Sequence, residues 1–557
     1  MSVLWRRVLI SSPHTLFQAR GVITVVSANS HATPGSDTEF PRVNPWLIAM
    51  TVMLATFMEV LDTSIANVAL PHIAGSLSAS VDESTWVLTS YLIANAIILP
   101  LSGWLTELFG RKRFYMTCVV IFTASSLLCG IAPSLQLLVF FRIMQGLGGG
   151  GLQPSAQAIL ADTFPPRQRG IAFSIYGMAV VFAPAIGPTL GGWITDSYSW
   201  RWLFYINVPV GILSLLLVSR LIHNPPALAG KPLTRANLLS MDWMGMGLLA
   251  LGLGSLEFVL DKGQEDDWFG SGKIRFLVAI AIVCLIVVVI RELVIRHPVV
   301  DLKLYKDRNF SLSNILIFCL GFVLAGSTVL LPQFLQTLLG YSATRAGMVL
   351  SPGGIVLIFT MPMAGLLLGR IGARPMIVFG FIVLGSSLWL TSRLQLQTDY
   401  ATFTIVRMMA SVGLASLFTP ISTTCFSRVP PGKNNAASSL YNLMRNLGSS
   451  FGIAAVTTVL ARRVQLHQSR LTEHLSEAHI RVRQTQTGQY LAQHGDGLGL
   501  PAARAARMLY RSVLQQAGAM AYLDAFWLLG TLCFVMPVFA LFIVKVKHAS
   551  APTLPAE

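Results

Sequence analysis

Two carboxylic acids lie inside the first long apolar stretch of the chain, where a charge is costly. Glu59 and Asp62 fall within residues 46–70, which are enough to cross a bilayer as one helix, because a crossing takes about 20 residues. A carboxylate there costs at least ~2.5 kcal/mol on insertion scales, so it normally faces a polar cavity and handles protons, ions or substrate. The spacing of three places both acids on one helical face. The pair predicts a proton-coupled membrane process with Asp62 as its centre, and the participation of Glu59 stays open.

The composition of the chain is that of a membrane protein. Of the 557 residues, 54% are apolar and 11% are charged, and the mean hydropathy is +0.64. A soluble protein carries roughly 25% charged residues. The net charge of +16 does not indicate a nucleic-acid partner, because the basic residues recur in short clusters between apolar runs. The six cysteines lie in apolar runs without a CxxC pair, so we interpret them as buried apolar residues and expect no disulfide or metal site.

Fourteen apolar stretches are long enough to be membrane spans. The predicted spans are 46–70, 86–106, 114–133, 136–162, 170–195, 203–222, 243–260, 274–295, 311–333, 346–368, 375–393, 401–425, 436–461 and 520–545. Basic residues gather in the loops after even-numbered spans, which predicts that both termini are cytoplasmic. The arginines of the loop 462–519 weigh little in this rule because the loop is long. That loop is either a solvated linker or a docking surface for a partner.

The sequence repeats itself at long range. Arg142 and Tyr176 match Arg407 and Tyr441 at a separation of 265 positions. Spans 1–6 and 9–14 therefore form two six-helix repeats around an inserted pair, spans 7–8, in an all-α integral membrane protein with fourteen transmembrane helices. The predicted parts are a cytoplasmic tail at 1–45, an N-terminal six-helix bundle at 46–222, an inserted pair at 243–295, a C-terminal six-helix bundle at 311–545 with 462–519 outside the cytoplasm, and a cytoplasmic tail at 546–557.

The segment 103–112 resembles the signature that follows the second helix in the major facilitator superfamily. Glu107 stands where the family usually has Asp, and its spacing of four from Arg111 suits a charge relay at the cytoplasmic mouth. Small glycines let membrane helices approach closely. An ordinary basic loop is the alternative. The predicted cytoplasmic gate comprises Gly103, Glu107, Gly110, Arg111 and Lys112.

A run of prolines and glycines in the fifth span resembles the antiporter signature of exporters in the same family. Prolines at this spacing bend a helix, and glycines clear one face for tight packing against a neighbour. Ala183 replaces the first glycine of the signature and is still small. The residues of this antiporter motif are Pro184, Gly187, Pro188, Gly191 and Gly192.

Three further features of the spans bear on function or match a known sequence pattern. Arg142 in span 4 needs an acidic or carbonyl partner if it is buried, and the resemblance implies a role in proton transfer beside the first-span acid; snorkelling to the outer headgroups is the rival interpretation. Glu257 and Asp261 end span 7, where we favour a solvated helix end over contact with a cationic substrate. The glycines of 146–151 fit a nucleotide-binding pattern, but they lie within a span and predict helix packing.

Segments 57–71 and 200–209 are similar to those of the fourteen-helix drug:proton antiporters of the EmrB/QacA type, and the similarity extends over 45–545. The resemblance implies proton-coupled efflux of amphipathic drugs or toxic small molecules by alternating access in a bacterial inner membrane. It also implies small-molecule drugs, protons and membrane lipid as partners, with a periplasmic adaptor and a TolC-type outer-membrane channel in some members.

We expect neither enzymatic activity nor a cofactor. Two other functions stay open: a solute uptake symporter of the same fold, and a non-transporting membrane receptor or scaffold. The antiporter motif argues against the first and the intramembrane acids against the second.

Overall fold

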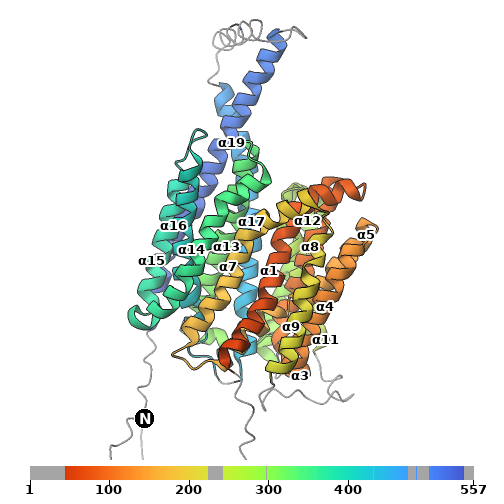
Figure 1. The fold of residues 1–557 in the computed structure, drawn as a ribbon, viewed down its shortest axis with the longest axis vertical. Coiled ribbons are helices and arrows are strands. Elements are labelled where there is room, and N and C mark those ends of the chain that lie inside the picture. Colours follow the sequence, from red (N-terminus) through yellow and green to blue (C-terminus); the bar gives the residue numbers. More distant parts are fainter. Residues whose placement is uncertain are drawn as a thin grey trace, which may run out of the picture. The chain divides into compact units, whose positions relative to one another are not determined.

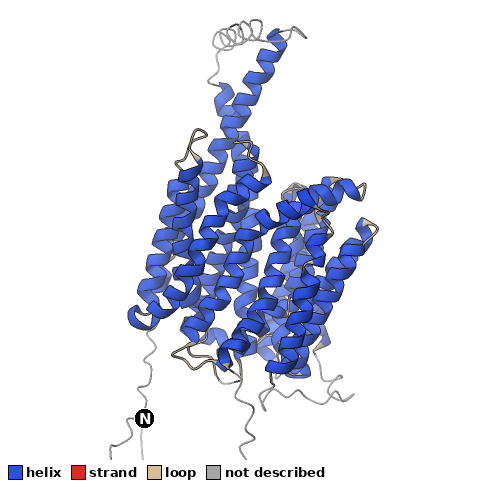
Figure 2. Ribbon diagram, in the orientation of Figure 1, coloured by secondary structure: helices blue, strands red, loops and turns tan. Residues whose placement is uncertain are grey.

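The computed structural model describes residues 44–223, 242–295, 298–430, 432–473, 485 and 501–544. Regular structure in these residues is helical throughout (Figure 2), and thirteen of their helices are long and apolar enough to cross a membrane. The predicted fold class, an all-α integral membrane protein, is confirmed. Residues 1–43 and 546–557 of the predicted tails, and residues 474–484 and 486–500 of the predicted loop 462–519, lie outside the described residues.

The helices of the first predicted bundle and of the inserted pair follow the expected order (Figure 1). They are α1 (Pro45–Ser76), α2 (Val81–Ser84), α3 (Trp86–Phe109), α4 (Arg111–Ile131), α5 (Leu135–Gly149), α6 (Leu152–Thr163), α7 (Arg169–Ser197), α8 (Trp202–Tyr205), α9 (Asn207–Leu221), α11 (Trp243–Lys262), η2 (Trp268–Gly270) and α12 (Gly272–Val294). Spans 4 and 6 each consist of two helices, α5 with α6 and α8 with α9, a division that the apolar pattern does not indicate.

The second predicted bundle begins after a short 3₁₀ turn. Its elements are η3 (Leu302–Lys306), α13 (Arg308–Thr337), α14 (Ala343–Ile371), α15 (Ala373–Thr391), α16 (Tyr400–Cys425), α17 (Asn434–Glu473), α19 (Pro501–Val535) and α20 (Pro537–Leu541). Below, the inner end of the helices is the end at which α1 begins, and the outer end is the opposite one.

The long-range repeat is visible in the backbone. Gly110 ends α3 and Gly372 ends α14, at φ values of 83° and 87°. This left-handed conformation favours glycine because a side chain would be strained there. The two glycines occupy equivalent turns between the second and third helices of each repeat.

Helix α17 is not among the thirteen apolar helices, although it corresponds to the predicted span 13. Its polar side chains can be accommodated because it packs against other helices, chiefly α13, α19 and α3. The contact with α13 is very close: a Cβ added at Gly448 would lie 2.8 Å from the carbonyl carbon of Phe318. With α17 included, the described helices supply the fourteen predicted spans.

The inserted pair has one helix against the protein and one against lipid. In the most apolar window of α12 the mean hydropathy is 2.9 and only 22% of the residues are buried, whereas 50% of the α11 window is buried. A helix that exposes apolar side chains over most of its surface needs a lipid surrounding. Helix α11 instead packs against α3 and α17.

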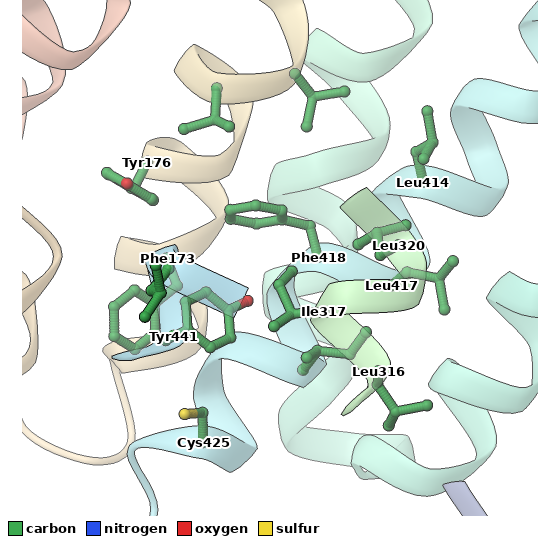
Figure 3. Close-up of a cluster of buried hydrophobic side chains, with 14 of the residues drawn as sticks. Phe173, Tyr176, Leu316, Ile317, Leu320, Leu414, Leu417, Phe418, Cys425 and Tyr441 are labelled. Carbon is green, nitrogen blue, oxygen red and sulfur yellow. The ribbon is translucent and has the colours of Figure 1, made fainter. Parts of the chain in front are cut away.

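An apolar cluster joins helices of the two repeats near the inner end (Figure 3). Phe173 and Tyr176 of α7 meet Phe418 of α16 and Tyr441 of α17, and the Tyr176 and Phe418 ring centroids are 6.1 Å apart. Gly177 gives Phe418 room, because a Cβ there would lie 2.8 Å from Cε1 of its ring and closer still to Cδ1. The two repeats are therefore packed together over the inner half.

Polar contacts at the same level hold α17 against the first repeat. Ser102 and Ser439 share a hydrogen bond of 2.8 Å. The Gln157 side-chain oxygen accepts hydrogen bonds from Ser438 at 3.1 Å and Asn442 at 2.8 Å. All these side chains are buried, so their hydrogen bonds with one another replace those that water would otherwise supply.

Candidate functional site

Asp62 lies midway along α1 in a fully buried cluster of polar side chains. Arg142 Nη1 donates to its Oδ2 at 2.6 Å, while Gln145 Nε2 and Asn207 Nδ2 donate to its Oδ1 at 3.0 and 2.7 Å. Asp62 is 2% exposed and Arg142 is 0% exposed. An arginine cannot give up its charge in a protein. The Asp62 carboxyl in this arrangement accepts hydrogen bonds from three donors, one of which carries a permanent positive charge.

Three helices hold the Arg142 guanidinium in place. Its Nε donates to the carbonyl oxygen of Val87 on α3 at 3.0 Å, and its Nη1 also donates to Gln145 at 2.8 Å. The guanidinium carbon lies 4.3 Å from the centroid of the Tyr91 ring, in a cation–π arrangement. The interpretation of Arg142 as a residue that snorkels to the outer headgroups is therefore wrong, because its side chain points into the bundle.

Glu59 lies on the same face of α1 and belongs to a second buried cluster. Its Oε1 accepts from the Tyr91 hydroxyl at 3.1 Å and from Asn95 Nδ2 at 3.3 Å, and its Oε2 accepts from Gln153 Nε2 at 2.5 Å. The Gln153 side-chain oxygen in turn accepts from Arg445 of α17. Glu59 is thereby connected to the second repeat, and Tyr91 contacts both clusters because its ring lies under Arg142.

The predicted gate lies at the inner end, where α3 turns into α4. Arg111 is 3% exposed and forms an ion pair with Asp162 of α6. Asn434, at the start of α17, donates to the same carboxylate. Asp162 is therefore an acid at the gate that the sequence motif does not contain.

The other gate residues lie around this ion pair. A Cβ added at Gly103 would lie 3.1 Å from the Cα of Ala436, so this glycine allows α17 to approach α3. Lys112 donates to the Ser219 carbonyl oxygen at 2.6 Å, which joins α4 to α9. Glu107 is on the exposed side of the last turn of α3.

The antiporter motif of α7 packs against α1 just beyond Asp62. A Cβ added at Gly187 would lie 2.6 Å from the Ser64 Cβ, and one at Gly191 would lie 3.0 Å from the Ile65 Cγ2. Ser64 Oγ also donates to the Pro184 carbonyl oxygen at 3.4 Å. Motif members Pro188 and Gly192 continue the same helix. The motif thus sets how closely α7 approaches the segment of α1 that carries the acid.

Comparison with known proteins decides the family. Residues 52–453 match the sequence profile of the Major Facilitator Superfamily. The chain belongs to this superfamily. The multidrug export protein EmrB of Escherichia coli (strain K12) is 36% identical over 510 residues, which cover 90% of this chain and 97% of that protein. The fatty acid resistance protein FarB of Neisseria gonorrhoeae is 36% identical over 502 residues, which cover 89% of this chain and 96% of that protein.

A solved structure agrees with the assignment at the level of fold. The proton:xylose symporter XylE has a TM-score of 0.56 and 14% sequence identity, and the match covers 89% of this chain and 94% of that one. The major facilitator fold that the motifs indicate is therefore confirmed.

One interpretation of the acids in this major facilitator is wrong. Glu257 was expected at a solvated helix end, but it is 4% exposed, and Ser450 Oγ of α17 donates to its Oε1 at 2.5 Å. Asp261, one turn further along α11, accepts a hydrogen bond from Thr89 of α3. The acids face α3 and α17 because α11 packs against both helices.

The sequence motifs miss most of the side chains that surround the two acids. These are Tyr91, Asn95, Gln145, Gln153, Asn207 and Arg445. The available signal is that each is a polar or amphipathic residue inside an apolar span. Among the described residues no group of three His, Cys, Asp or Glu side chains could hold a metal ion. All six cysteines are buried, as predicted.

The glycines of 146–151 serve helix packing, as predicted. A Cβ at Gly148 would lie 2.7 Å from the backbone nitrogen of Phe122, and one at Gly150 would lie 2.7 Å from the Asn95 carbonyl oxygen. These close approaches bring span 4 against α3 and α4. They thereby fix the position of Arg142 relative to α1.

Proposed function

We propose that this major facilitator exports amphipathic drugs or toxic small molecules from a bacterial inner (plasma) membrane in exchange for protons. The observation that carries the proposal is the Asp62 carboxylate, buried midway along α1 and bound by Arg142, Gln145 and Asn207. A buried acid of this kind marks a proton or substrate pathway. The relatives named for multidrug export and fatty acid resistance support amphipathic substrates.

The chemical step is protonation of Asp62. A proton that arrives from the outer side converts the carboxylate to a carboxylic acid, and Arg142 keeps its charge but loses its counter-ion. Arg142 of α5 and Asn207 of α9 both bond to this carboxylate. Protonation of the carboxylate therefore weakens the contacts that hold α1 against α5 and α9. The neutral state favours opening at the inner end, where the proton leaves and the drug enters.

Opening at the inner end requires that the contacts between repeats break. These are the apolar cluster around Phe418, the hydrogen bonds of Gln157 to α17, and the hydrogen bond of Asn434 to Asp162, the acid that also pairs with Arg111. With this many buried contacts between them, the two repeats should switch between two discrete arrangements and not slide gradually past each other. We assign the gate role to this set, with both chain termini on the cytoplasmic side.

Exchange rather than symport is favoured by the antiporter motif. Gly187 and Gly191 bring α7 into backbone-level contact with α1 directly beyond Asp62. Movement of α7 in the alternating-access step then changes the surroundings of the acid. A drug and a proton would in this way use the site in turn.

The test is proton release by the purified protein in sealed liposomes with an acidic interior. Addition of ethidium or of oleate to the outside should dissipate the pH gradient, because substrate enters as protons leave. Empty liposomes and liposomes with the Asp62→Asn variant are the controls. Accumulation of substrate without proton movement, or an intact gradient with both compounds, contradicts the exchange mechanism.

We further propose a periplasmic adaptor and a TolC-type outer-membrane channel as partners. Helix α17 has 40 residues and is about 60 Å long, twice the hydrocarbon thickness, and α19 runs beside it beyond the outer ends of the neighbouring helices (Figure 1). Asp524 of α19 holds the two together, with His467 at 2.8 Å and Arg463 at 3.5 Å. A photocrosslinking residue at Tyr510 should capture the adaptor in cells, whereas one at Trp389, on the lipid side of α15, should not.

A further inference from the structure

The inserted helix α11 carries a buried acid that the exchange mechanism above does not use. Glu257 is 4% exposed and lies at the contact of α11 with α17. Its Oε1 accepts from Ser450 Oγ at 2.5 Å. A carboxylate in a membrane span is costly unless it has partners or a function. A helix that only filled space between the repeats would not need this residue.

Hydrogen bonds and one turn of α17 connect Glu257 to Glu59. Ser450 lies one helical turn after Asn446, whose Nδ2 donates to Asn95 Oδ1 at 3.3 Å. Asn95 Nδ2 donates to Glu59 Oε1 at 3.3 Å. Side chains of α11, α17, α3 and α1 are thus connected from Glu257 to Glu59, with one backbone turn of α17 joining Ser450 to Asn446.

Ser450 can exist in two hydrogen-bonded states. Its hydroxyl has two acceptors, Glu257 Oε1 at 2.5 Å and the carbonyl oxygen of Asn446 at 3.3 Å, and its single proton can serve one of them at a time. If Glu257 takes up a proton, its new O–H donates to Ser450 Oγ, and the Ser450 hydroxyl turns to the Asn446 carbonyl. In this step the O–H bond on Glu257 forms as one O–H bond of a hydronium ion at the outer side breaks and leaves a water molecule. Both states satisfy the hydroxyl.

Other charged groups on the packed helices have partners of their own. Asp261, on α11, accepts from Thr89 of α3, and the Lys273 ammonium of α12 lies 3.1 Å from Asp266. On α17, Arg445 lies five residues before Ser450 and donates to the Gln153 side chain. In the outer half Thr89 of α3 and Thr85, the residue that precedes α3, face α11 and bond to Asp261 and Lys262.

We propose that Glu257 is a second proton-binding site, through which the inserted helix pair adds one proton to each transport cycle. The proposal rests on the proposed drug:proton exchange and extends it. Protonation of Glu257 reverses the Ser450 hydrogen bond and so alters the contact of α11 with α17. Since α17 carries Asn446 and Arg445, both connected to Glu59, the state of Glu257 is communicated to the first acid cluster.

The experiment measures how many protons accompany each substrate molecule. The full-length protein in liposomes is given a range of imposed pH gradients, and the ethidium gradient that it sustains is recorded. One pH unit is a tenfold change in proton activity, so loss of one coupled proton should reduce the sustained gradient about tenfold per pH unit. Glu257→Gln should show this loss and still exchange, because Asp62 is intact. Glu257→Asp should restore the coupled proton. Glu265 is an exposed acid just after the end of α11, and Glu265→Gln should match the unmodified protein.

Two results overturn the inference. The first is a Glu257→Gln protein with the unmodified dependence on the pH gradient. The second comes from Ser450→Ala, which is measured if Glu257→Gln does not fold. This variant keeps the acid but removes the switching hydroxyl, so an unchanged pH dependence of exchange contradicts the proposal. An unmodified protein whose ethidium gradient does not respond to pH at all instead refutes the exchange mechanism, so the two failures are distinguishable.

Discussion

Substitution of Asp62 by Asn should abolish exchange, and the structure indicates a cost in stability as well. The carboxylate accepts two amide donors at Oδ1 and one guanidinium donor at Oδ2. An asparagine offers one oxygen and one NH₂ group, so in either orientation its NH₂ group faces a donor. The substitution also leaves the fully buried Arg142 without a counter-ion, and breaking a buried pair from one side costs about 3–5 kcal/mol.

A second substitution separates the chemical from the structural effect. Arg142→Gln in the Asp62→Asn background removes the orphaned charge and leaves amides that can bond to one another. Replacement of both members of a buried ion pair is often neutral or stabilising. The double variant should therefore recover most of the stability lost in Asp62→Asn, yet it should remain without exchange because no group at the site takes up a proton.

The assays are thermal unfolding in detergent and proton-coupled ethidium exchange in liposomes, applied to a complete double-mutant cycle. Asp82→Asn, the same change at an exposed acid at the outer end, is the matched control and should behave as the unmodified protein. Exchange at the normal rate in either Asp62 variant refutes the assignment of the proton site. A double variant no more stable than Asp62→Asn refutes the argument from the unpaired guanidinium.

Three further predictions follow from packing, charge and orientation. Gly187→Val should lower stability by about 1–3 kcal/mol by overpacking and slow exchange, whereas Gly369→Val, where a Cβ meets no atom within 4 Å, should leave thermal unfolding and exchange unchanged. Hydrogen bonds from Arg291 hold the pKa of Asp242 below its usual range, so Asp242→Asn should cost about 1–2 kcal/mol in thermal unfolding above pH about 4. That difference should shrink as the pH falls through the lowered pKa; a constant difference would refute it. In intact cells an impermeant thiol reagent should label Gln397→Cys but not Gln168→Cys, and the opposite pattern would invert the proposed orientation.

The sequence alone marks the two acids of α1 as candidate functional residues, because the cost of a charge in a bilayer does not depend on the rest of the fold. Their partners are harder to find. Gln145, Gln153 and Asn207 are neutral, so each weakens the apolar pattern of its span only slightly. The division of span 4 between α5 and α6 is also hidden, because the glycines at the junction read as apolar packing residues.

Contacts between helices account for the remaining differences. Arg111 pairs with Asp162, which belongs to another helix and no local motif, so spacing alone cannot reveal it. Glu257 was expected in solvent because it lies near the end of an apolar stretch, yet α17 covers it. Gly110 and Gly372 show the opposite case: the repeat places both at equivalent turns, and the left-handed backbone there explains why glycine occurs twice.

The polarity of α17 has a consequence for how the protein enters the membrane. Arg445 alone opposes insertion at mid-helix by about 2.5–3.5 kcal/mol on translocon scales, and Asn442 and Asn446 add to that cost. The helix therefore partitions into lipid only when earlier helices already offer partners for these groups, as α6 does through Gln153 and Gln157. Biogenesis then has an order, in which the first repeat must be assembled before α17 can leave the translocon. A chain truncated directly after α17 and lacking the first repeat would leave this helix outside the bilayer.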